Sequence, residues 1–485
     1  MTRPIPFEVT DTLLDQIRQL IEERRNAGLE ELLQDVHHAD IAEILDALNT
    51  EEATYLVKLL DSEKTSEALM ELDEDVRERL LDNLTAKEIA SELEELDTDD
   101  AVDFISELDD EMQRKVISAI EDEEHARDIV EMLMYDEDSA GGLMAKELVK
   151  VRETWTVAGC VRKMRAQAQN VTRVHSVYVV DAQDRLIGRL SLKDLLTADA
   201  KSRIADIYIA NVDHVNVKDK GEEVARLMQK YDLEAIPVTN DAGTLLGRIT
   251  IDDIVDFIRD EADRDYQMAA GISEDVEADD SVLRIVRARL PWLLLGLVGS
   301  LCAVYIMQGF GGALTSHPEL FFFTPLIAAM AGNVGVQSSA IIVQGLVNDN
   351  VKGSLFLRMV KEISINLING AAVGILVIAF AAMISLETMV GLTIAIAMLC
   401  VMIVASLIGT FVPIILHKRG IDPAIATGPF ITTSNDIFGI FLFFMALQRL
   451  HLMMKFICIH QIQLYLFNRN RFSQISWFIN IIAFF

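Results

Sequence analysis

The sequence predicts a multidomain membrane protein: an all-α superhelical N-terminal domain, a tandem pair of α+β domains, and an all-α membrane domain of five helices. Charge is the first indication, because the formal net charge of −32 falls almost entirely within residues 1–284. Hydropathy is the second, because the chain from about residue 285 contains five apolar runs of about twenty residues or more, the length that crosses a bilayer. The third is a strand and helix pattern that occurs twice between these regions.

Residues 1–143 are predicted to form helices throughout. Apolar runs with helical period alternate with short acidic turns, as at Leu96–Asp100. Asp97 and Thr85 each precede such a run and are predicted N-caps, because their side-chain oxygens can accept from free backbone amides. The recurrence of short helix pairs indicates a superhelix of repeated units.

Two segments that match in spacing and residue type predict a duplicated domain over residues 144–202 and 203–258. Gly188–Asp194 reads Gly-Arg-Leu-Ser-Leu-Lys-Asp, and Gly247–Asp253 reads Gly-Arg-Ile-Thr-Ile-Asp-Asp. Each begins at a glycine turn, continues as a short strand and leads into a helix. These segments resemble a tandem pair of CBS domains.

The resemblance to CBS domains implies a regulatory sensor, with adenosine nucleotides such as ATP as candidate ligands. In that family the aspartate that opens the final helix often contacts a ribose, which implies Asp194 or Asp253 in this chain. A structural module without a ligand is the alternative interpretation.

An acidic helix is predicted to begin within Asp252–Asp265 and to lead through the connecting segment 259–284. Asp253, Asp256 and Asp260 follow one another at helical spacing, so that one face carries several carboxylates. Like charges this close destabilise an isolated helix. The helix is therefore either well solvated or bridged by cations.

Residues 285–450 are predicted to form the membrane domain. The loops after the second and fourth spans carry basic residues, and the other two loops between spans carry no Lys or Arg. The positive-inside rule then places the N-terminus in the cytoplasm and predicts a multi-pass protein of the cell (inner) membrane. The predicted spans lie near residues 290–310, 319–346, 360–384, 390–416 and 423–447.

Asp436 carries the only charge in the apolar stretch 424–444. An ionisable group within a membrane span usually faces a protein interior or a water-filled path. Thr432 and Thr433, at i−4 and i−3, are predicted to share its face of the helix. A carboxylate among hydroxyls suits Mg²⁺ that keeps its water shell. A neutral aspartic acid hydrogen-bonded to a neighbouring helix is the alternative.

The second span places Gly332 beside Asn333, with Gln337 one turn further. Small residues let helices approach closely, whereas amide side chains are unfavourable against lipid and should face another helix or an aqueous path. Pro325 is expected to break or kink this helix and to free backbone carbonyls that suit a hydrated cation. We therefore predict that these residues line a pore, with hydrogen bonding between helices as the alternative.

The order of the domains, together with Ala331–Ala340 and Asp422–Asp436, resembles the MgtE family of magnesium channels. The resemblance implies a homodimer with one pore on the two-fold axis. It further implies that Asp436 from each copy holds a hydrated Mg²⁺ and that Asn333 lines the pore.

The resemblance also implies a cytosolic Mg²⁺ sensor, in which ions bridge acidic faces and close the pore. Lys220 and Arg264 stand where the family pattern leads us to expect acids. The acidic residues that the resemblance assigns to the sensor are Asp99, Asp103, Glu222, Asp232, Asp253, Asp256, Glu261 and Asp265.

Several other classes of protein fit the sequence poorly. The acidity argues against a nucleic-acid partner, and the scattered cysteines argue against a disulfide framework or a zinc site. We find no set of residues typical of catalysis and predict no enzyme. The alternatives that stay open are transport of Co²⁺ or another divalent ion, a Na⁺-coupled carrier, and a nucleotide-responsive membrane sensor without transport.

Residues 451–485 turn basic and aromatic, unlike the preceding sequence, and their apolar runs are too short to span a membrane. Members of the MgtE family end soon after the fifth span. We interpret this tail as a replaced or frame-shifted terminus and expect it to be poorly ordered.

Overall fold

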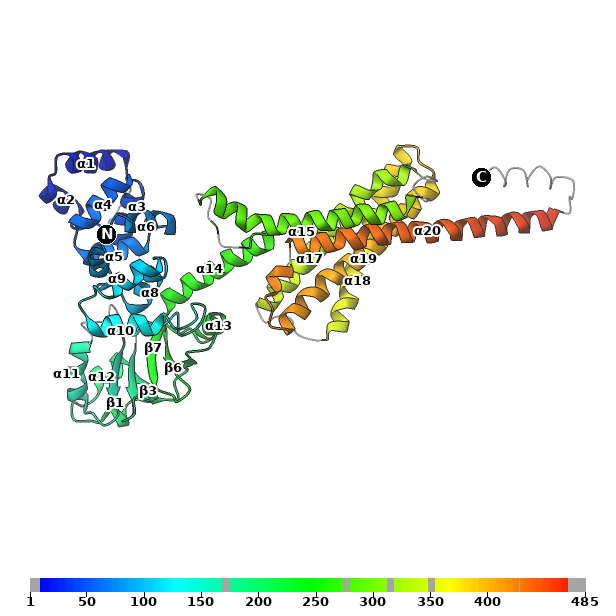
Figure 1. The fold of residues 1–485 in the computed structure, drawn as a ribbon. Coiled ribbons are helices and arrows are strands. Elements are labelled where there is room, and N and C mark those ends of the chain that lie inside the picture. The colour runs from blue at the N-terminus through cyan, green and yellow to red at the C-terminus, as the bar shows by residue number, and fades with distance from the viewer. Residues whose placement is uncertain are drawn as a thin grey trace, which may run out of the picture. The chain divides into compact units, whose positions relative to one another are not determined.

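The structure is a computed structural model that forms two compact units, Met1–Glu261 and Ala262–Phe485 (Figure 1). It describes residues 9–469 with several gaps. The positions outside the description are 1–8, 168–173, 175, 274–275, 277–279, 312–317, 348–353, 427 and 470–485, and for side chains also 74–75, 347, 426 and 450–469.

The N-terminal domain is helical, as predicted, and its helices share a continuous core of leucine and isoleucine side chains. In α7 the Glu88 amide donates to the Thr85 hydroxyl at 3.3 Å, and the Thr85 amide donates to the Glu88 carboxylate at 2.7 Å. This capping box satisfies amides that a helix start otherwise leaves free, which confirms the predicted cap. Asp97, by contrast, precedes α8 without bonding its amides. The helices are α1 (Asp11–Glu22), α2 (Asn26–Leu33), α3 (His38–Asp46), α4 (Thr50–Leu59), α5 (Ser62–Met70), α6 (Glu74–Leu81), α7 (Ala86–Leu93), α8 (Thr98–Ser106), α9 (Asp110–Ile117) and α10 (Glu123–Met132).

Each repeat contains a small sheet in which a parallel pair of strands leads into an antiparallel pair. The matching strands and helices were predicted from the sequence, whereas their pairing was not. In the first repeat β1 pairs parallel with β2, and β2 pairs antiparallel with β3. In the second, β5, β6 and β7 pair in the same order and sense. The elements of the two repeats are β1 (Val149–Arg152), α11 (Val157–Gln167), β2 (Val177–Val180), β3 (Leu186–Leu190), α12 (Leu192–Thr197), η2 (Ile204–Asp206), β4 (Ile209–Ala210), β5 (Val215–Asn216), α13 (Gly221–Tyr231), β6 (Ala235–Thr239) and β7 (Leu245–Thr250).

The segment that leaves the N-terminal domain runs along the second repeat before it enters the first. The Ala140 amide donates to the Asp219 carbonyl at 2.7 Å. Ala145 and Arg248 exchange two backbone hydrogen bonds, of 2.8 and 2.9 Å. The exit from the N-terminal domain is thereby bonded to the repeat that lies farther along the chain.

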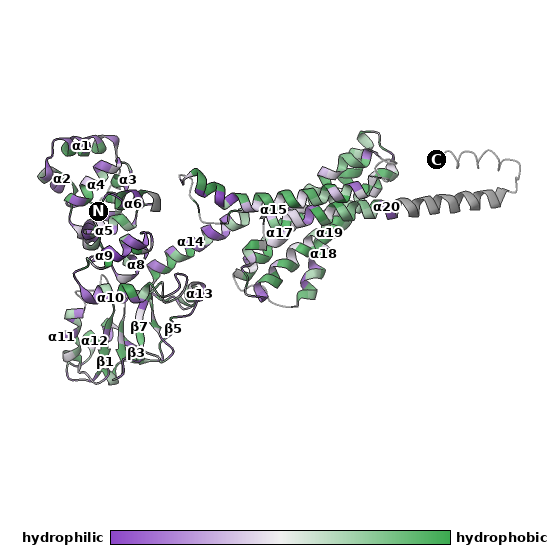
Figure 2. Cartoon of the chain, viewed as in Figure 1, coloured by the Kyte–Doolittle hydropathy of each residue, from purple (hydrophilic) through white to green (hydrophobic). Residues whose placement is uncertain are grey.

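The second unit contains, within its described residues, five helices long and apolar enough to cross a membrane, the number that was predicted. Figure 2 shows hydrophobic residues distributed along these helices. The helices α17, α19 and α20 contact one another around buried side chains that include Ile327, Met398 and Phe443. The spanning helices are α15 (Val282–Gly309), α17 (Thr324–Val347), α18 (Leu355–Met383), α19 (Thr388–Lys418) and α20 (Gly428–Arg469).

Pro325 begins a helix and does not interrupt one. It lies in the first turn of α17, directly after the 3₁₀ segment η3 (Pro318–Phe323). Proline suits this place, because its fixed φ is helical and its missing amide would have no partner within the helix there. Of the two predicted effects, a break or a kink, the structure has a change of helix type directly before Pro325 and not a kink within α17.

Two helices differ in extent from the sequence-based expectation. The helix α14 (Ile251–Ala270) begins inside the range predicted for the second repeat and ends well before residue 284. The helix α20 continues to Arg469, so residues 451–469 of the tail have a helical backbone. Residues 470–485 lie outside the described part of the chain.

Glu92 is a buried carboxylate in the N-terminal domain, and it predicts a pH dependence of local stability. The Thr65 hydroxyl donates to it at 2.6 Å. Burial raises the pKa of Glu92 from 4.5 to about 7, which corresponds to roughly 3 kcal/mol for holding the charged form. Because the folded pKa is the higher one, the folded state binds more protons than the unfolded state between these values. Stability then falls as pH rises from about 4.5 to 7.

We expect Glu92→Gln to remove this dependence. Hydrogen exchange of the α5 and α7 amides should be slower in the variant than in the wild type at pH 8, after correction for intrinsic rates. At pH 5 the two proteins should exchange alike, because Glu92 is then already neutral. Equal protection at both pH values would contradict a charged, destabilising Glu92.

Candidate ion-conduction site and acidic cluster

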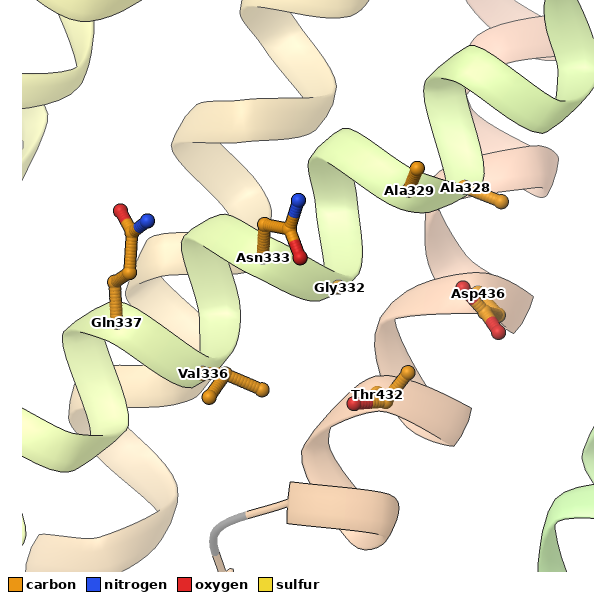
Figure 3. Close-up of a pocket in the computed structure, with 8 residues that line it drawn as sticks. All are labelled: Ala328, Ala329, Gly332, Asn333, Val336, Gln337, Thr432 and Asp436. Atoms are coloured by element: carbon orange, nitrogen blue, oxygen red, sulfur yellow. The ribbon is translucent and has the colours of Figure 1, made fainter.

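A cavity of about 490 Å³ lies between α17 and α20. Asp436 and Thr432 lie one turn apart on α20, and Gly332 and Asn333 line the cavity from α17 (Figure 3). The Thr432 hydroxyl donates to the Gly428 carbonyl at 2.9 Å, so its oxygen can still accept from water. The remaining lining residues are Ala328, Ala329, Val336 and Gln337. The wall thus combines a carboxylate with hydroxyl and amide groups among small side chains.

Thr433 does not line the cavity, although it was expected there beside Thr432. It lies against Gly299 of α15, where the missing side chain of glycine gives it room. Successive residues of an α-helix turn by about 100°. The i−3 position is therefore about 60° away from Asp436 around α20, enough to face a different helix. The structure brings the other predicted pore residues together: Asp436, Asn333, Gly332, Gln337 and Thr432.

Glycines bring the spanning helices into close contact beside the cavity. Gly409 of α19 lies against the backbone of Gly335 of α17, so closely that a Cβ atom on Gly409 would meet the Gly335 carbonyl oxygen. On its other side Gly335 lies against Asn435, which is 1% exposed and precedes Asp436. The approach of α17 to α19 and to the turn of α20 before Asp436 therefore depends on contacts that leave no space for a side chain at these glycines.

A second concentration of carboxylates lies in the first unit, where α8, the segment after the N-terminal domain and the start of α14 meet. Each of these groups acts electrostatically on others in the set. Within the described residues no group of three or more carboxylate, imidazole or thiol side chains is placed to hold a metal ion directly. We refer to Asp97, Asp99, Asp100, Asp103, Glu147 and Asp253 as the acidic cluster.

The acidic cluster resists full ionisation. Burial raises the pKa of Asp97 to about 6 and that of Asp100 to about 7, and neighbouring carboxylates raise both further. The pKa of Asp99 is raised well above its ordinary value, first by burial and then by Asp100. A raised carboxyl pKa shows that the folded arrangement disfavours the anion. A cation bound near these groups would relieve that penalty.

The structure brings part of the sensor set predicted by resemblance into the acidic cluster. Asp99, Asp103 and Asp253 belong to the cluster, and Asp256 lies one turn after Asp253 and feels its charge. The other four residues lie elsewhere: Glu222 and Asp232 at opposite ends of α13, and Glu261 and Asp265 about two and three turns beyond Asp253 on α14.

A smaller cavity, of about 100 Å³, lies between the two repeats. Neither residue predicted to contact a nucleotide lines it. Asp194 lies in the first turn of α12. Asp253 accepts hydrogen bonds from the Thr250 amide, at 3.0 Å, and from the Thr250 hydroxyl. The lining residues are Ser176, Tyr178, Arg189, Ile209, Asn211, Val212, Asp213, Leu233, Ala235 and Pro237.

The sequence did not predict three residues of the acidic cluster, nor the arginine that pairs with one of them. Asp97 and Asp100 flank the predicted Asp99 in one acidic turn, so the local sequence already contained their signal. Glu147 and Arg248 carried no such signal. They come from the segment after the N-terminal domain and from β7, and only the folded chain places them beside α8.

The fold and these sites define a class of multi-pass membrane protein that has a polar cavity among its spans and a soluble half with two α+β repeats. Family comparisons agree along the chain. Residues 36–138 match the MgtE intracellular N domain, residues 140–201 and 204–260 match the CBS domain, and residues 324–446 match the MgtE family, described as a divalent cation transporter. The chain belongs to the MgtE family.

The magnesium transporter MgtE of Enterococcus faecalis is 36% identical over 322 residues, which are 66% of this chain and 71% of the relative. That of Bacillus subtilis is 34% identical over 65% of this chain and 70% of its own length. That of Thermus thermophilus is 31% identical over 65% of this chain and 71% of its own length. Among solved structures, the cytosolic domain of the Mg²⁺ channel MgtE in complex with ATP is 33% identical, with a TM-score of 0.48, and covers 50% of this chain and 99% of that one.

Proposed function

We propose that this protein carries Mg²⁺ into the cell through the cavity beside Asp436, and that Mg²⁺ bound in the soluble half closes the path. The observation that carries the proposal is the cavity, which gathers Asp436, Thr432 and Asn333 among membrane-spanning helices. The family and its magnesium transporters support Mg²⁺ as the ion. They also support a multi-pass protein of the cell membrane whose acidic half is cytoplasmic.

The chemistry of the lining fits a hydrated divalent ion. Mg²⁺ dehydrates reluctantly and prefers oxygen ligands. A single carboxylate supplies charge, and the Thr432 hydroxyl and the Asn333 amide can hydrogen-bond to the water shell. We infer that Asp436 attracts the ion and that the neighbouring polar groups replace part of its second hydration layer. A selectivity that depends on the hydrated ion leaves Co²⁺ as a competing cargo.

A homodimer would complete the path. In one chain Asn333 and Gln337 are exposed beside the half-buried Asp436, on helices that cross the membrane. Lipid cannot satisfy such groups, so another protein surface or water must cover them. We infer that a second copy does so, with its own Asp436 facing the same ion.

The acidic cluster is the proposed sensor. Its carboxylates repel one another without a counter-ion, and divalent cations would favour the arrangement in which α8 lies against the second repeat. Such an ion shifts the population only as far as it binds one arrangement better than the other. Nucleotide binding between the repeats is a further proposal, supported by the small cavity that contains Tyr178, Arg189 and Asp213. It would place the ligand on these residues and not on Asp194 or Asp253.

Mg²⁺ flux into liposomes that contain the full chain, followed with an entrapped Mg²⁺-sensitive dye, tests transport and gating together. We expect flux when Mg²⁺ is low on the side of the soluble half, and about tenfold less when millimolar Mg²⁺ fills that side. Asp253→Asn should weaken this inhibition, because the acidic cluster loses a charge. Asp241→Asn is the control, since Asp241 pairs with Lys218 on the surface.

Each part of the proposal has its own contrary result. The absence of flux into these liposomes would contradict transport, and flux that ignores Mg²⁺ on the side of the soluble half would contradict gating. Stronger inhibition of uptake by Co²⁺ than by excess Mg²⁺ would favour the alternative cargo.

A further inference from the structure

Arg248 occupies an unusual place for a charged side chain. It lies in the middle of β7 and is only 5% exposed. Its guanidinium donates from Nε to the Glu147 carbonyl at 2.6 Å and forms an ion pair with Asp97 at 3.2 Å. Arg189, the corresponding residue of the first repeat, is exposed. The second repeat therefore places one permanent positive charge beside the acidic cluster, between β7 and α8.

The contacts of Arg248 reach the start of α8 by two routes. Asp97 stands at the N-cap of α8, but its carboxylate pairs with Arg248 instead of bonding the helix amides. Glu147 takes over the cap: its carboxylate accepts from the Thr98 amide at 3.1 Å and from the Thr98 hydroxyl at 2.9 Å. Arg248 in turn holds the backbone of Glu147. One guanidinium thus bonds both to α8 and to the residue that caps α8.

The charges around Arg248 are strongly unbalanced. Asp97 feels its guanidinium, which lowers the pKa of that carboxyl, but burial and Glu147 outweigh this effect. His125 also acts on Asp97, with a smaller influence than Arg248. An arginine stays protonated at any physiological pH and presents a rigid fork of donors. It can therefore neutralise part of the acidic cluster at all times, whether or not a divalent ion is present.

We propose that Arg248 is a built-in counter-cation that partly stabilises the docking of α8 on the second repeat when no divalent ion is bound. This inference rests on the proposed sensor role of the acidic cluster and specifies how that sensor behaves when empty. With Arg248 in place, α8 is partly docked on the second repeat without metal. Mg²⁺ then neutralises the remaining charge of the acidic cluster. Without it, docking depends on divalent ions alone, and the gain in docking that Mg²⁺ produces becomes larger.

Hydrogen exchange of the full chain in detergent, first in EDTA and then with Mg²⁺, tests the proposal without a measurement of transport. We expect peptides covering residues 96–106 and 139–148 to exchange about tenfold faster in Arg248→Gln than in the wild type, because breaking a buried ion pair leaves an unpaired carboxylate. Millimolar Mg²⁺ should restore the wild-type rate. Arg248→Lys keeps the charge and should retain most of the protection in EDTA.

Lys218→Gln is the matched control, since it removes a positive charge from an exposed pair of the same repeat, at 2.6 Å from Asp241. It should leave exchange of both peptides unchanged. Three results overturn the proposal: unchanged exchange in Arg248→Gln, failure of Mg²⁺ to restore protection to that variant, or an Arg248→Lys variant as unprotected as Arg248→Gln. The second would show that Arg248 is needed for folding and not as a counter-charge. A wild type that gains no protection from Mg²⁺ would instead count against the sensor itself.

Discussion

Asp436→Asn is expected to reduce Mg²⁺ flux by about a hundredfold, with the protein still folded. The substitution keeps the shape of the side chain and removes its charge. A charge-assisted hydrogen bond to the ion's water shell contributes up to about 3 kcal/mol, which is about a hundredfold in an equilibrium or rate. The flux assay in liposomes, run at equal protein content, measures the loss.

Asp422→Asn is the matched control for this experiment. Asp422 lies shortly before α20, and its carboxylate accepts from the Ala424 amide at 2.7 Å and does not line the cavity. Its variant should retain most of the flux. Asp436→Glu should recover part of the activity, because it restores the charge at a slightly different place. Wild-type flux in Asp436→Asn would rule out Asp436 as the ion-binding group.

Gly409→Ala is expected to destabilise the membrane domain severely. The new methyl group would meet the Gly335 carbonyl oxygen, and it would come within 3.1 and 3.2 Å of the Gly335 carbonyl carbon and Cα. These are backbone atoms, so relief requires that α17 and α19 move apart. Overpacking of this kind typically costs about 1–3 kcal/mol, and more where the backbone cannot yield. A large fall in the temperature at which the detergent-solubilised protein loses its monodisperse gel-filtration peak would show the effect.

Gly374→Ala provides the same chemical change at a tolerant position. A Cβ atom on Gly374 would meet only the Ala395 methyl group, at an ordinary 3.5 Å. Its thermal stability should remain near that of the wild type. If Gly409→Ala proved as stable as Gly374→Ala, the close approach of α17 and α19 could not be what positions the cavity.

The spanning helices and the main cavity residues were accessible from sequence because each carries a local signal. A long apolar run has few alternatives to a membrane span, and a charge or amide within it has few places to face. Asp436, Asn333 and Gln337 could therefore be predicted from the sequence as lining residues of a pore, with hydrogen bonding between helices as the alternative. The duplicated strands were likewise visible, because similar residues recur at matching positions, although Gly188 and Gly247, which were predicted as turns, lie inside β3 and β7.

The errors arose where orientation or long-range contact decides the outcome. Thr433 shares a broad face with Asp436, but the position of α15 determines which of the two threonines meets the cavity. Pro325 has opposite effects inside a helix and at its start, and the start was not identified from sequence. Arg248 and Glu147 lie 101 positions apart, so their contact depends on how the repeats fold together.

The bonds that tie Ala140 to Asp219 and Ala145 to Arg248 have a mechanical consequence. They attach the segment that leaves the N-terminal domain to the second repeat. In that repeat, β7 is followed by α14 without a linker. A displacement of α8 can therefore reach α14 through the second repeat, without passing through the first. The first repeat lies outside this direct connection and is joined to the second repeat by separate bonds, such as that from the Leu186 amide to the Gly243 carbonyl at 3.0 Å.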